Sequence, residues 1–178
     1  MRIVSGKYKS RRLTAPKNLP VRPTTDMAKE SLFNIINNWY HFHEVRVLDL
    51  FSGTGNISYE FASRGATNII AVEQHSGCIY YINQTAKELD FDIQTIKADV
   101  FSFLGKHQGS YDVIFADPPY DFSDEQFGKI PALVFENNLL SENGTLIVEH
   151  SQQTDLNNLP NFTQSKRYGG CMFSFFEH

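Results

Sequence analysis

Short apolar runs alternate with segments of helical periodicity along most of this chain. Five of the runs are bounded by turn-forming residues, which predicts buried strands. Two final runs, about 162–168 and 171–176, predict an antiparallel hairpin that turns at Gly169-Gly170. Repeated strand–helix units predict an α/β fold, a mostly parallel seven-stranded sheet with helices on both faces. The first five strands are expected at 45–50, 68–73, 93–98, 111–116 and 145–150, and the helices between them at 56–64, 77–89, 100–104 and 124–137.

The first 25 residues follow a different pattern. Apolar positions on either side of Gly6 predict a short hairpin over residues 2–15, and a proline-rich connector follows at 16–25. We therefore expect two parts, a basic N-terminal arm at 1–25 and one domain at 26–178.

A helix is predicted to begin directly after the connector. Thr24, Thr25 and Asp26 are candidate caps, because short polar side chains satisfy free amide groups at the start of a helix. The apolar residues that follow recur at helical spacing and define one face. That face is expected to carry Ala28, Leu32, Ile35, Ile36 and Trp39.

Charge is distributed unevenly along the chain. The formal net charge is −4, but residues 1–29 hold eight basic residues and one acid, which gives +7, and the remainder carries −11. A basic arm on an acidic domain predicts a polyanionic partner that binds through the arm. The candidate contact residues are Arg2, Lys7, Lys9, Arg11, Arg12 and Arg22.

Two other interpretations of the arm remain open. It is either a solvated, disordered tail or an Arg-rich transit peptide. The transit peptide is disfavoured, because Gly6, Pro16, Pro20 and Pro23 break any amphipathic helix.

Several site classes find no support in the composition. Cys78 and Cys171 lie far apart and are expected to be reduced and inert, and the six histidines show no metal-ligand spacing, so we expect no metal site. No run of apolar residues is long enough to span a bilayer, and no signal peptide is visible, so a cytoplasmic location is expected. The default expectation for the oligomeric state is a monomer.

The run Asp117-Pro118-Pro119-Tyr120 follows the fourth expected strand directly. Ligands bind at the carboxyl ends of strands in open α/β sheets. Because neither proline has an N–H, this turn offers an acidic side chain and free carbonyl groups, which suit a substrate with an NH2 group. Tyr120 can stack on a flat base. The sequence therefore predicts a clamp for the exocyclic amine of a nucleobase, with an ordinary Pro-Pro turn as the alternative.

A glycine-containing turn follows the first expected strand. Gly53 and Gly55 match the first two positions of G-x-G-x-x-G, but the third position is Ser58. Carboxylates stand near the ends of three successive strands, at Asp49, Glu73 and Asp99.

These acids around a glycine turn fit a cationic, adenosine-containing ligand better than a pyrophosphate, which prefers helix N–H groups without nearby acids. S-adenosylmethionine, with its sulfonium and ammonium groups, fits this description. The alternative is that Glu73 and Asp99 only cap the helices that follow them.

Several stretches resemble a known family. Residues 48–55 resemble the cofactor motif of class I methyltransferases, and 117–120 that of enzymes that methylate exocyclic amines. Residues 22–26, 63–66 and 167–170 are similar to signatures of the RsmD family, whose members methylate the N2 amine of guanine in bacterial small-subunit (16S) ribosomal RNA.

The resemblance covers nearly the whole chain and implies roles for individual residues. It implies a Rossmann-like class I methyltransferase fold and a ribosomal RNA or assembling 30S particle as partner. Catalysis would involve Asp117, Pro118, Pro119 and Tyr120, and RNA contact would involve the basic arm together with Thr24. S-adenosylmethionine would be held by Asp49, Phe51, Ser52, Gly53, Thr54, Gly55, Glu73, Asp99, Val100 and Asp117.

Three other functions compete with this hypothesis. A DNA or RNA adenine-N6 methyltransferase shares both motifs, although 178 residues leave no room for a DNA target-recognition domain. A non-catalytic RNA-binding module could keep the fold, but it would not need an intact clamp and cofactor turn. A nicotinamide-dependent dehydrogenase is disfavoured by the absent third glycine.

Overall fold

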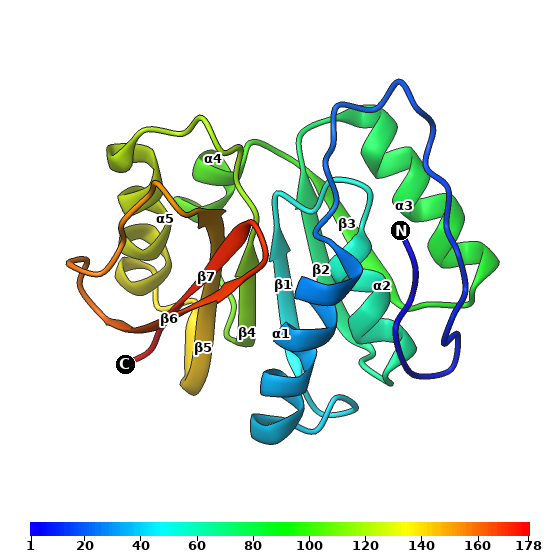
Figure 1. The fold of residues 1–178 in the computed structure, drawn as a ribbon, viewed down its shortest axis with the longest axis horizontal. Helices are drawn as coiled ribbons and strands as arrows, with labels where there is room; N and C mark the ends of the chain where they lie inside the picture. Colours follow the sequence, from blue (N-terminus) through cyan, green and yellow to red (C-terminus); the bar gives the residue numbers. More distant parts are fainter.

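A computed structural model describes all 178 residues and is built around one seven-stranded sheet with the strand order β3-β2-β1-β4-β5-β7-β6 (Figure 1). Strands β1 to β5 are parallel, and β7 pairs antiparallel with both β5 and β6. This confirms the expected fold class. The strands are β1 (Arg46–Leu50), β2 (Asn68–Glu73), β3 (Ile93–Lys97), β4 (Tyr111–Ala116), β5 (Leu140–Ser151), β6 (Phe162–Tyr168) and β7 (Cys171–Phe176).

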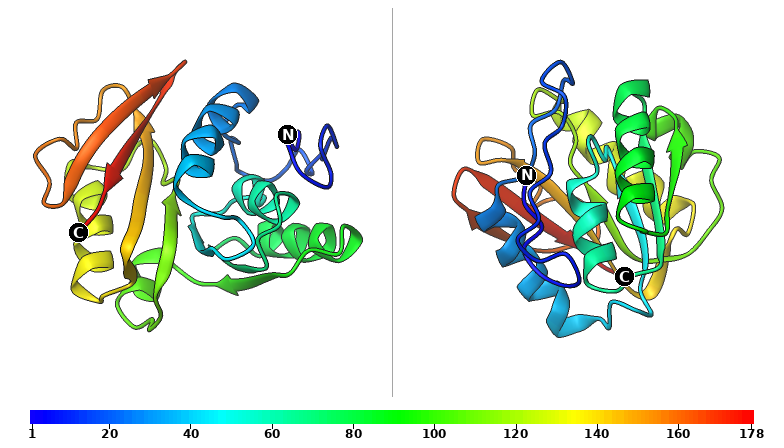
Figure 2. Two further views of the ribbon diagram at one scale, coloured as in Figure 1. Left: turned by 90° about the horizontal axis from the view of Figure 1, so that it is seen from below. Right: turned by 90° about the vertical axis from the view of Figure 1, so that its right-hand side faces the viewer.

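Five helices cover the two faces of the sheet (Figure 2). Three of them pack on one face and two on the other, so alternate strand residues enter different cores. The side chains of Val47 and Val113 belong to the core on the first face, and those of Leu48 and Ile114 belong to the core on the second face. No helix combines the length and the apolar character needed to cross a bilayer. The helices are α1 (Asp26–Trp39), α2 (Asn56–Ser63) and α3 (Ser76–Glu88) on the first face, and α4 (Val100–Leu104) and α5 (Asp124–Glu136) on the second.

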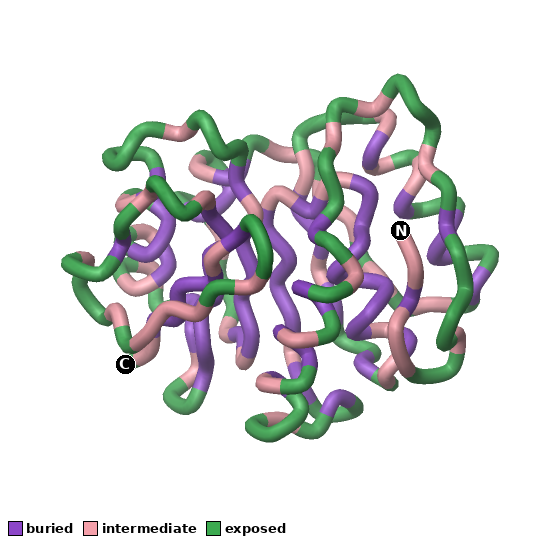
Figure 3. Tube along the Cα trace, in the orientation of Figure 1, coloured by how far each residue is buried: buried purple, intermediate pink, exposed green.

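The sheet is the most buried part of the molecule, and its central strands form a continuous buried layer (Figure 3). β5 is longer than the expected 145–150, because Leu140 also pairs with Tyr111 across an irregularity in the register. The continuous apolar character of β1, β4 and β5 follows from burial on both faces.

The prediction of the apolar face of α1 was partly wrong. Thr25 caps the helix as expected, by accepting a hydrogen bond from the Ala28 amide. Trp39, however, is 41% exposed at the end of the helix, whereas the charged Lys29 is fully buried. The buried face therefore includes Lys29, which has polar partners inside the protein, in place of Trp39.

The arm packs against the domain and is not a solvated tail. Its two halves form the expected hairpin, with an antiparallel bridge between Arg2 and Arg12, and its apolar residues Ile3 and Leu13 are buried. Gly6 adopts φ +87°, and a Cβ atom there would lie 1.9 Å from the Ser63 carbonyl oxygen. Only glycine fits this close approach between the arm and α2.

A buried acid in α2 anchors the arm. The Glu60 carboxylate accepts hydrogen bonds from the amides of Val4 and Ser5 at 2.9 and 3.0 Å. It also pairs with Lys29 Nζ at 3.4 Å and with Arg64 Nε at 3.0 Å. Lys29 in turn donates to the carbonyl of Arg2. This network joins the arm, α1 and α2 in the protein interior.

We expect Glu60→Gln to destabilise the protein by about 3–5 kcal/mol, because it leaves the buried Lys29 ammonium without its counter-charge. Urea unfolding measures this loss, and hydrogen exchange at the Val4 and Ser5 amides reports release of the arm. The matched control is Glu88→Gln, which removes an exposed ion pair to Arg11 of the same arm. It should cost less than about 1 kcal/mol. Equal losses in the two variants would contradict the anchoring role.

Candidate active site

A cavity of about 1140 Å³ opens at the edge of the sheet where β1 to β5 end. Its lining comes from the residues that follow β1, β2, β3 and β4, from the carboxyl end of β5, from the connector at residues 20–25 and from the turn between β6 and β7. In doubly wound sheets this is the edge at which ligands bind.

The glycine turn between β1 and α2 forms one wall of the cavity. Gly53 and Gly55 adopt φ +54° and +88°, and Gly55 precedes the first residue of α2. A Cβ atom on Gly55 would lie 2.7 Å from the Tyr59 ring. Phe51 also has a left-handed backbone, with φ +55°, which is unfavourable for a bulky residue and is found at functional sites.

Ser58, which stands at the position of the absent third glycine, makes a buried hydrogen bond. The Ser58 hydroxyl donates a hydrogen bond of 2.6 Å to the Asp49 carboxylate, and both residues are buried. Ser52 and Thr54 are also buried in this turn and contribute to the cavity lining.

Asp99 makes the capping contact that was the open alternative, whereas α3 is capped by His75 and not by Glu73, and both acids line the cavity. Glu73 accepts hydrogen bonds from the amides of Gly53, Gln74 and His75, so it ties the glycine turn to the end of β2. Asp99 caps α4 through the Ser102 amide at 2.9 Å. Capping of α4 therefore does not remove Asp99 from the cavity.

Three aromatic rings form an apolar part of the same wall. Phe51 lies with its ring centroid 6.3 Å from Phe101 and 5.6 Å from Phe122, and the latter two rings are stacked at 5.8 Å. Val100 is buried beside them at the start of α4. Such a surface suits a flat, weakly polar ring.

The expected clamp follows β4, which lies on the other side of β1 from β2. The Asp117 amide donates to the Leu50 carbonyl of β1 at 3.3 Å, which joins the clamp to the turn. The Pro119 carbonyl accepts a hydrogen bond from the Phe122 amide at 3.1 Å, whereas the Pro118 carbonyl accepts none from the protein. The Asp117 side chain and the Pro118 carbonyl are therefore available to a ligand.

Glu149, near the end of β5, is a site residue that the sequence analysis missed. It is buried on the cavity wall and accepts a 2.6 Å hydrogen bond from the Thr24 hydroxyl. Tyr120, which is 41% exposed, donates to the same carboxylate at 3.3 Å. The available signal was an acid near the end of an apolar run, the pattern that marked Glu73.

Three acids of the cavity, Asp49, Asp117 and Glu149, have pKa values above those of ordinary carboxyl groups. Burial raises the pKa of Asp49 to about 7. The pKa of Asp117 lies well above its usual range, because the carboxyl is buried and faces the negative charges of Glu149 and Asp49. Burial also raises the pKa of Glu149. Like charges held in a poorly solvated cavity account for these shifts.

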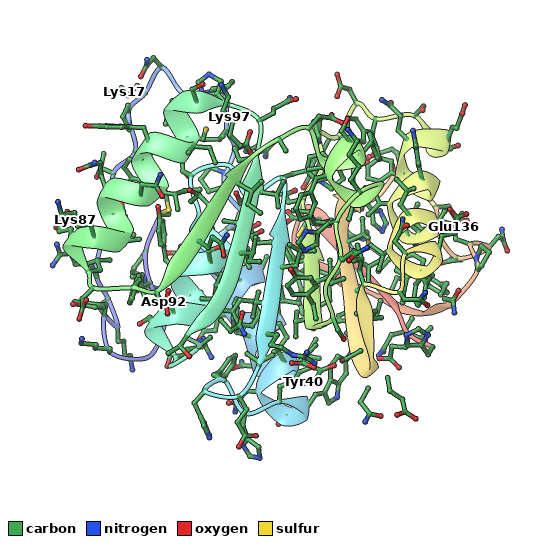
Figure 4. The ribbon with its side chains drawn as sticks, turned by 180° about the vertical axis from the view of Figure 1, so that it is seen from behind. Lys17, Tyr40, Lys87, Asp92, Lys97 and Glu136 are labelled. Carbon is green, nitrogen blue, oxygen red and sulfur yellow. The ribbon has the colours of Figure 1, made fainter.

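The basic residues of the arm lie in different surroundings. Arg2 pairs with Asp26 at 3.2 Å and Arg11 with Glu88 at 2.6 Å. Arg22 lines the cavity mouth with Thr24, and Lys17 lies at the same edge of the molecule as Lys97 of β3 (Figure 4). Exposed side chains without an acidic partner are those of Lys7, Lys9, Arg12, Lys17 and Arg22.

The remaining expectations concern cysteines and metals. Cys78 and Cys171 are both free and buried. No group of three or more His, Cys, Asp or Glu side chains has an arrangement that could hold a metal ion.

The raised pKa of Asp49 predicts a pH dependence of stability. Between its ordinary pKa of 3.8 and about 7, the folded state binds more protons at this carboxyl than the unfolded state. Its contribution to stability is therefore complete below pH 4 and is lost as the pH rises to 7. We expect Asp49→Asn to gain stability relative to the wild type over this range, by up to about 4 kcal/mol.

Urea unfolding of both proteins at pH 4, 5.5 and 7 measures the difference. The control is Asp92→Asn, which removes an exposed carboxyl at the start of β3 (Figure 4). Its difference from the wild type should not grow with pH. A pH-independent difference for Asp49→Asn would contradict the assignment.

Comparison with known proteins gives consistent matches over nearly the whole chain. The family described as Conserved hypothetical protein 95 matches residues 1–177. The Ribosomal RNA small subunit methyltransferase D of Buchnera aphidicola is 34% identical over 160 residues, a match that covers 89% of this chain and 79% of that protein. The protein of the same name from Haemophilus influenzae is 30% identical over 171 residues, covering 93% and 86% of the two chains.

Solved structures also match over nearly the whole chain. The Escherichia coli protein yhhF has a TM-score of 0.86 at 25% identity, and the match covers 100% of this chain and 97% of that one. A methylase structure from Haemophilus influenzae has a TM-score of 0.78 at 26% identity, with 98% and 96% of the two chains covered.

Proposed function

The chain belongs to the Conserved hypothetical protein 95 family, the RsmD family of ribosomal RNA methyltransferases, and we propose that it methylates the exocyclic N2 amine of a guanine in small-subunit (16S) ribosomal RNA, with S-adenosylmethionine as methyl donor. The observation that carries this proposal is the clamp at residues 117–120, whose free acceptors lie next to the glycine turn in one cavity. The guanine amine and the methyl donor could both bind in this cavity.

The cavity wall around the glycine turn fits the proposed methyl donor. Asp49 and Asp117 lack cationic partners and carry raised pKa values, so a ligand with a sulfonium and an ammonium group would relieve their repulsion. The ring cluster offers an apolar surface for adenine, and Glu73 and Asp99 offer acceptors for hydroxyl or amine groups. The proposed binding residues are Asp49, Phe51, Ser52, Gly53, Thr54, Gly55, Glu73, Asp99, Val100 and Asp117.

When bound, S-adenosylmethionine supplies a methyl group on a positively charged sulfur, which makes transfer intrinsically favourable. The protein's own contribution is alignment of the weakly nucleophilic amine. Asp117 and the Pro118 carbonyl accept its two hydrogen bonds, which directs the nitrogen lone pair at the methyl carbon. After the methyl group has been transferred, the nitrogen would release a proton, which the Asp117 carboxylate would accept.

Base and RNA binding complete the proposal. Tyr120 would stack on the unstacked guanine, as aromatic residues do in RNA recognition and base flipping. Residues 1–25 would contact the phosphate backbone of ribosomal RNA or of an assembling 30S particle in the cytoplasm, and residues 26–178 would carry catalysis. One chain contains the whole cavity, which suits a monomer.

We expect Asp117→Ala to lower kcat about 10²–10³-fold, because it removes the acceptor for the positive charge that develops on the amine. The affinity for S-adenosylmethionine, measured by calorimetry, should change much less. The matched control is Asp121→Ala, an exposed acid just after the clamp, which should keep its turnover. Full turnover in Asp117→Ala would refute the clamp.

The arm predicts a salt-dependent contribution to RNA binding. Neutralising Lys9 and Arg12 together should weaken binding and reduce the slope of log K against log salt by roughly 1.4–1.8, since about two fewer phosphate contacts release counterions. The control is Lys87→Gln/Lys106→Gln, which removes the same charge outside the arm. Filter binding of small-subunit ribosomal RNA at several salt concentrations measures both slopes. Identical slopes in the two double variants would remove the arm from the interface.

A further inference from the structure

Glu149 is a buried carboxylate on the cavity wall with no role in the reaction as described so far. Its neighbour Val148 in β5 pairs in register with Ala116 of β4. Continuing this register places Glu149 beside Asp117, on the side away from the glycine turn. Because neighbouring strands lie about 4.8 Å apart, the two carboxylates face the same part of the cavity.

The Glu149 carboxylate has unused hydrogen-bonding capacity. It is only 3% exposed, yet no Lys, Arg or His lies within ion-pair distance. It accepts one short hydrogen bond from Thr24, one long one from Tyr120 and a weak one from the Cys171 thiol, whereas a carboxylate has about four acceptor sites. A buried carboxylate in this state is costly unless a ligand completes its hydrogen bonds.

The charged form of this group has local support. Burial raises the pKa of Glu149, but the hydrogen bonds from Thr24, Tyr120 and Cys171 and the positive charge of Arg22 act in the opposite direction. A ligand group that donates a hydrogen bond to the carboxylate would favour the charged form further.

Guanine presents the donors that this pair of acids requires. Its N1–H and N2 amine are adjacent donors on one edge, so a base whose amine lies at Asp117 directs N1–H to a neighbouring acceptor. In adenine, the ring nitrogen next to the amine is itself an acceptor. Opposite a carboxylate it would leave two buried acceptors unpaired.

We propose that Glu149 is a specificity-determining residue that accepts a hydrogen bond from guanine N1–H while Asp117 holds the N2 amine. This inference rests on the proposed function. The competing role is structural, in which Glu149 only ties Thr24 and Tyr120 to β5 and is indifferent to the atom at position 1 of the base.

The test uses a base that keeps the reacting amine but replaces the N1–H donor with an acceptor, namely 2-aminopurine. The methylated guanosine is first located by mass analysis of digested small-subunit ribosomal RNA. An RNA fragment around it is then synthesised with either guanosine or 2-aminopurine riboside at that position. The ratio of kcat/KM for the two RNAs is measured for the wild type and for Glu149→Gln, whose amide can donate to an acceptor. Calorimetry with S-adenosylmethionine confirms that the variant is folded.

We expect the wild type to prefer guanosine by about 100-fold or more, and Glu149→Gln to reduce this ratio at least about tenfold. 2-Aminopurine also lacks the guanine O6, but that difference is the same for both proteins, so the change in the ratio reports the N1 contact. An unchanged ratio in the variant would overturn the proposal and leave the proposed function intact.

The wild type alone gives a second test that does not depend on the variant's folding. Methylation of both RNAs within about threefold of each other would also overturn the proposal, because a buried unpaired acceptor costs far more than this. No methylation of any guanosine would instead overturn the proposed function and this inference with it.

Discussion

The parallel arrangement of β1 to β5 is the constraint on which the site depends. Parallel strands end at one edge, so acids near their carboxyl ends gather in one cavity. Asp49, Asp117 and Glu149 face one another there with little solvent, and their raised pKa values are the electrostatic result. The cavity is therefore complementary to a ligand pair that brings positive charge and hydrogen-bond donors. A cationic methyl donor and an amine-bearing base together have these properties.

The buried network around Lys29 links this site to the arm. Lys29 donates to Asn56, the first residue of α2 after the glycine turn, and Asn56 donates to the Thr24 carbonyl in the connector. Thr24 in turn binds Glu149. The arm, the connector and the glycine turn are thus held in one relative position. The proposed RNA-binding arm is thus fixed next to the proposed catalytic cavity, as is expected of an enzyme that must present a single base to a methyl donor.

The sequence predicted the fold well because its strands are buried on both faces and appear as continuous apolar runs. It predicted the positions of the Pro-Pro turn and the glycine turn at the edge of the sheet because proline and glycine have strong conformational effects. The prediction of the buried face of α1 was partly wrong, since no local pattern indicates that Lys29 forms an ion pair with Glu60 in the interior. Glu149 was missed for a similar reason. Its importance comes from the pairing of β5 with β4, which is a tertiary contact.

The most direct test of this account is the identity of the methylated nucleoside. Small-subunit ribosomal RNA with its bound proteins, taken from cells that lack this gene, is incubated with the protein and labelled S-adenosylmethionine. The RNA is digested and its nucleosides are identified by mass. The account predicts label in N2-methylguanosine. Label in N6-methyladenosine would contradict the assigned base, and the absence of label in RNA would contradict the proposed function.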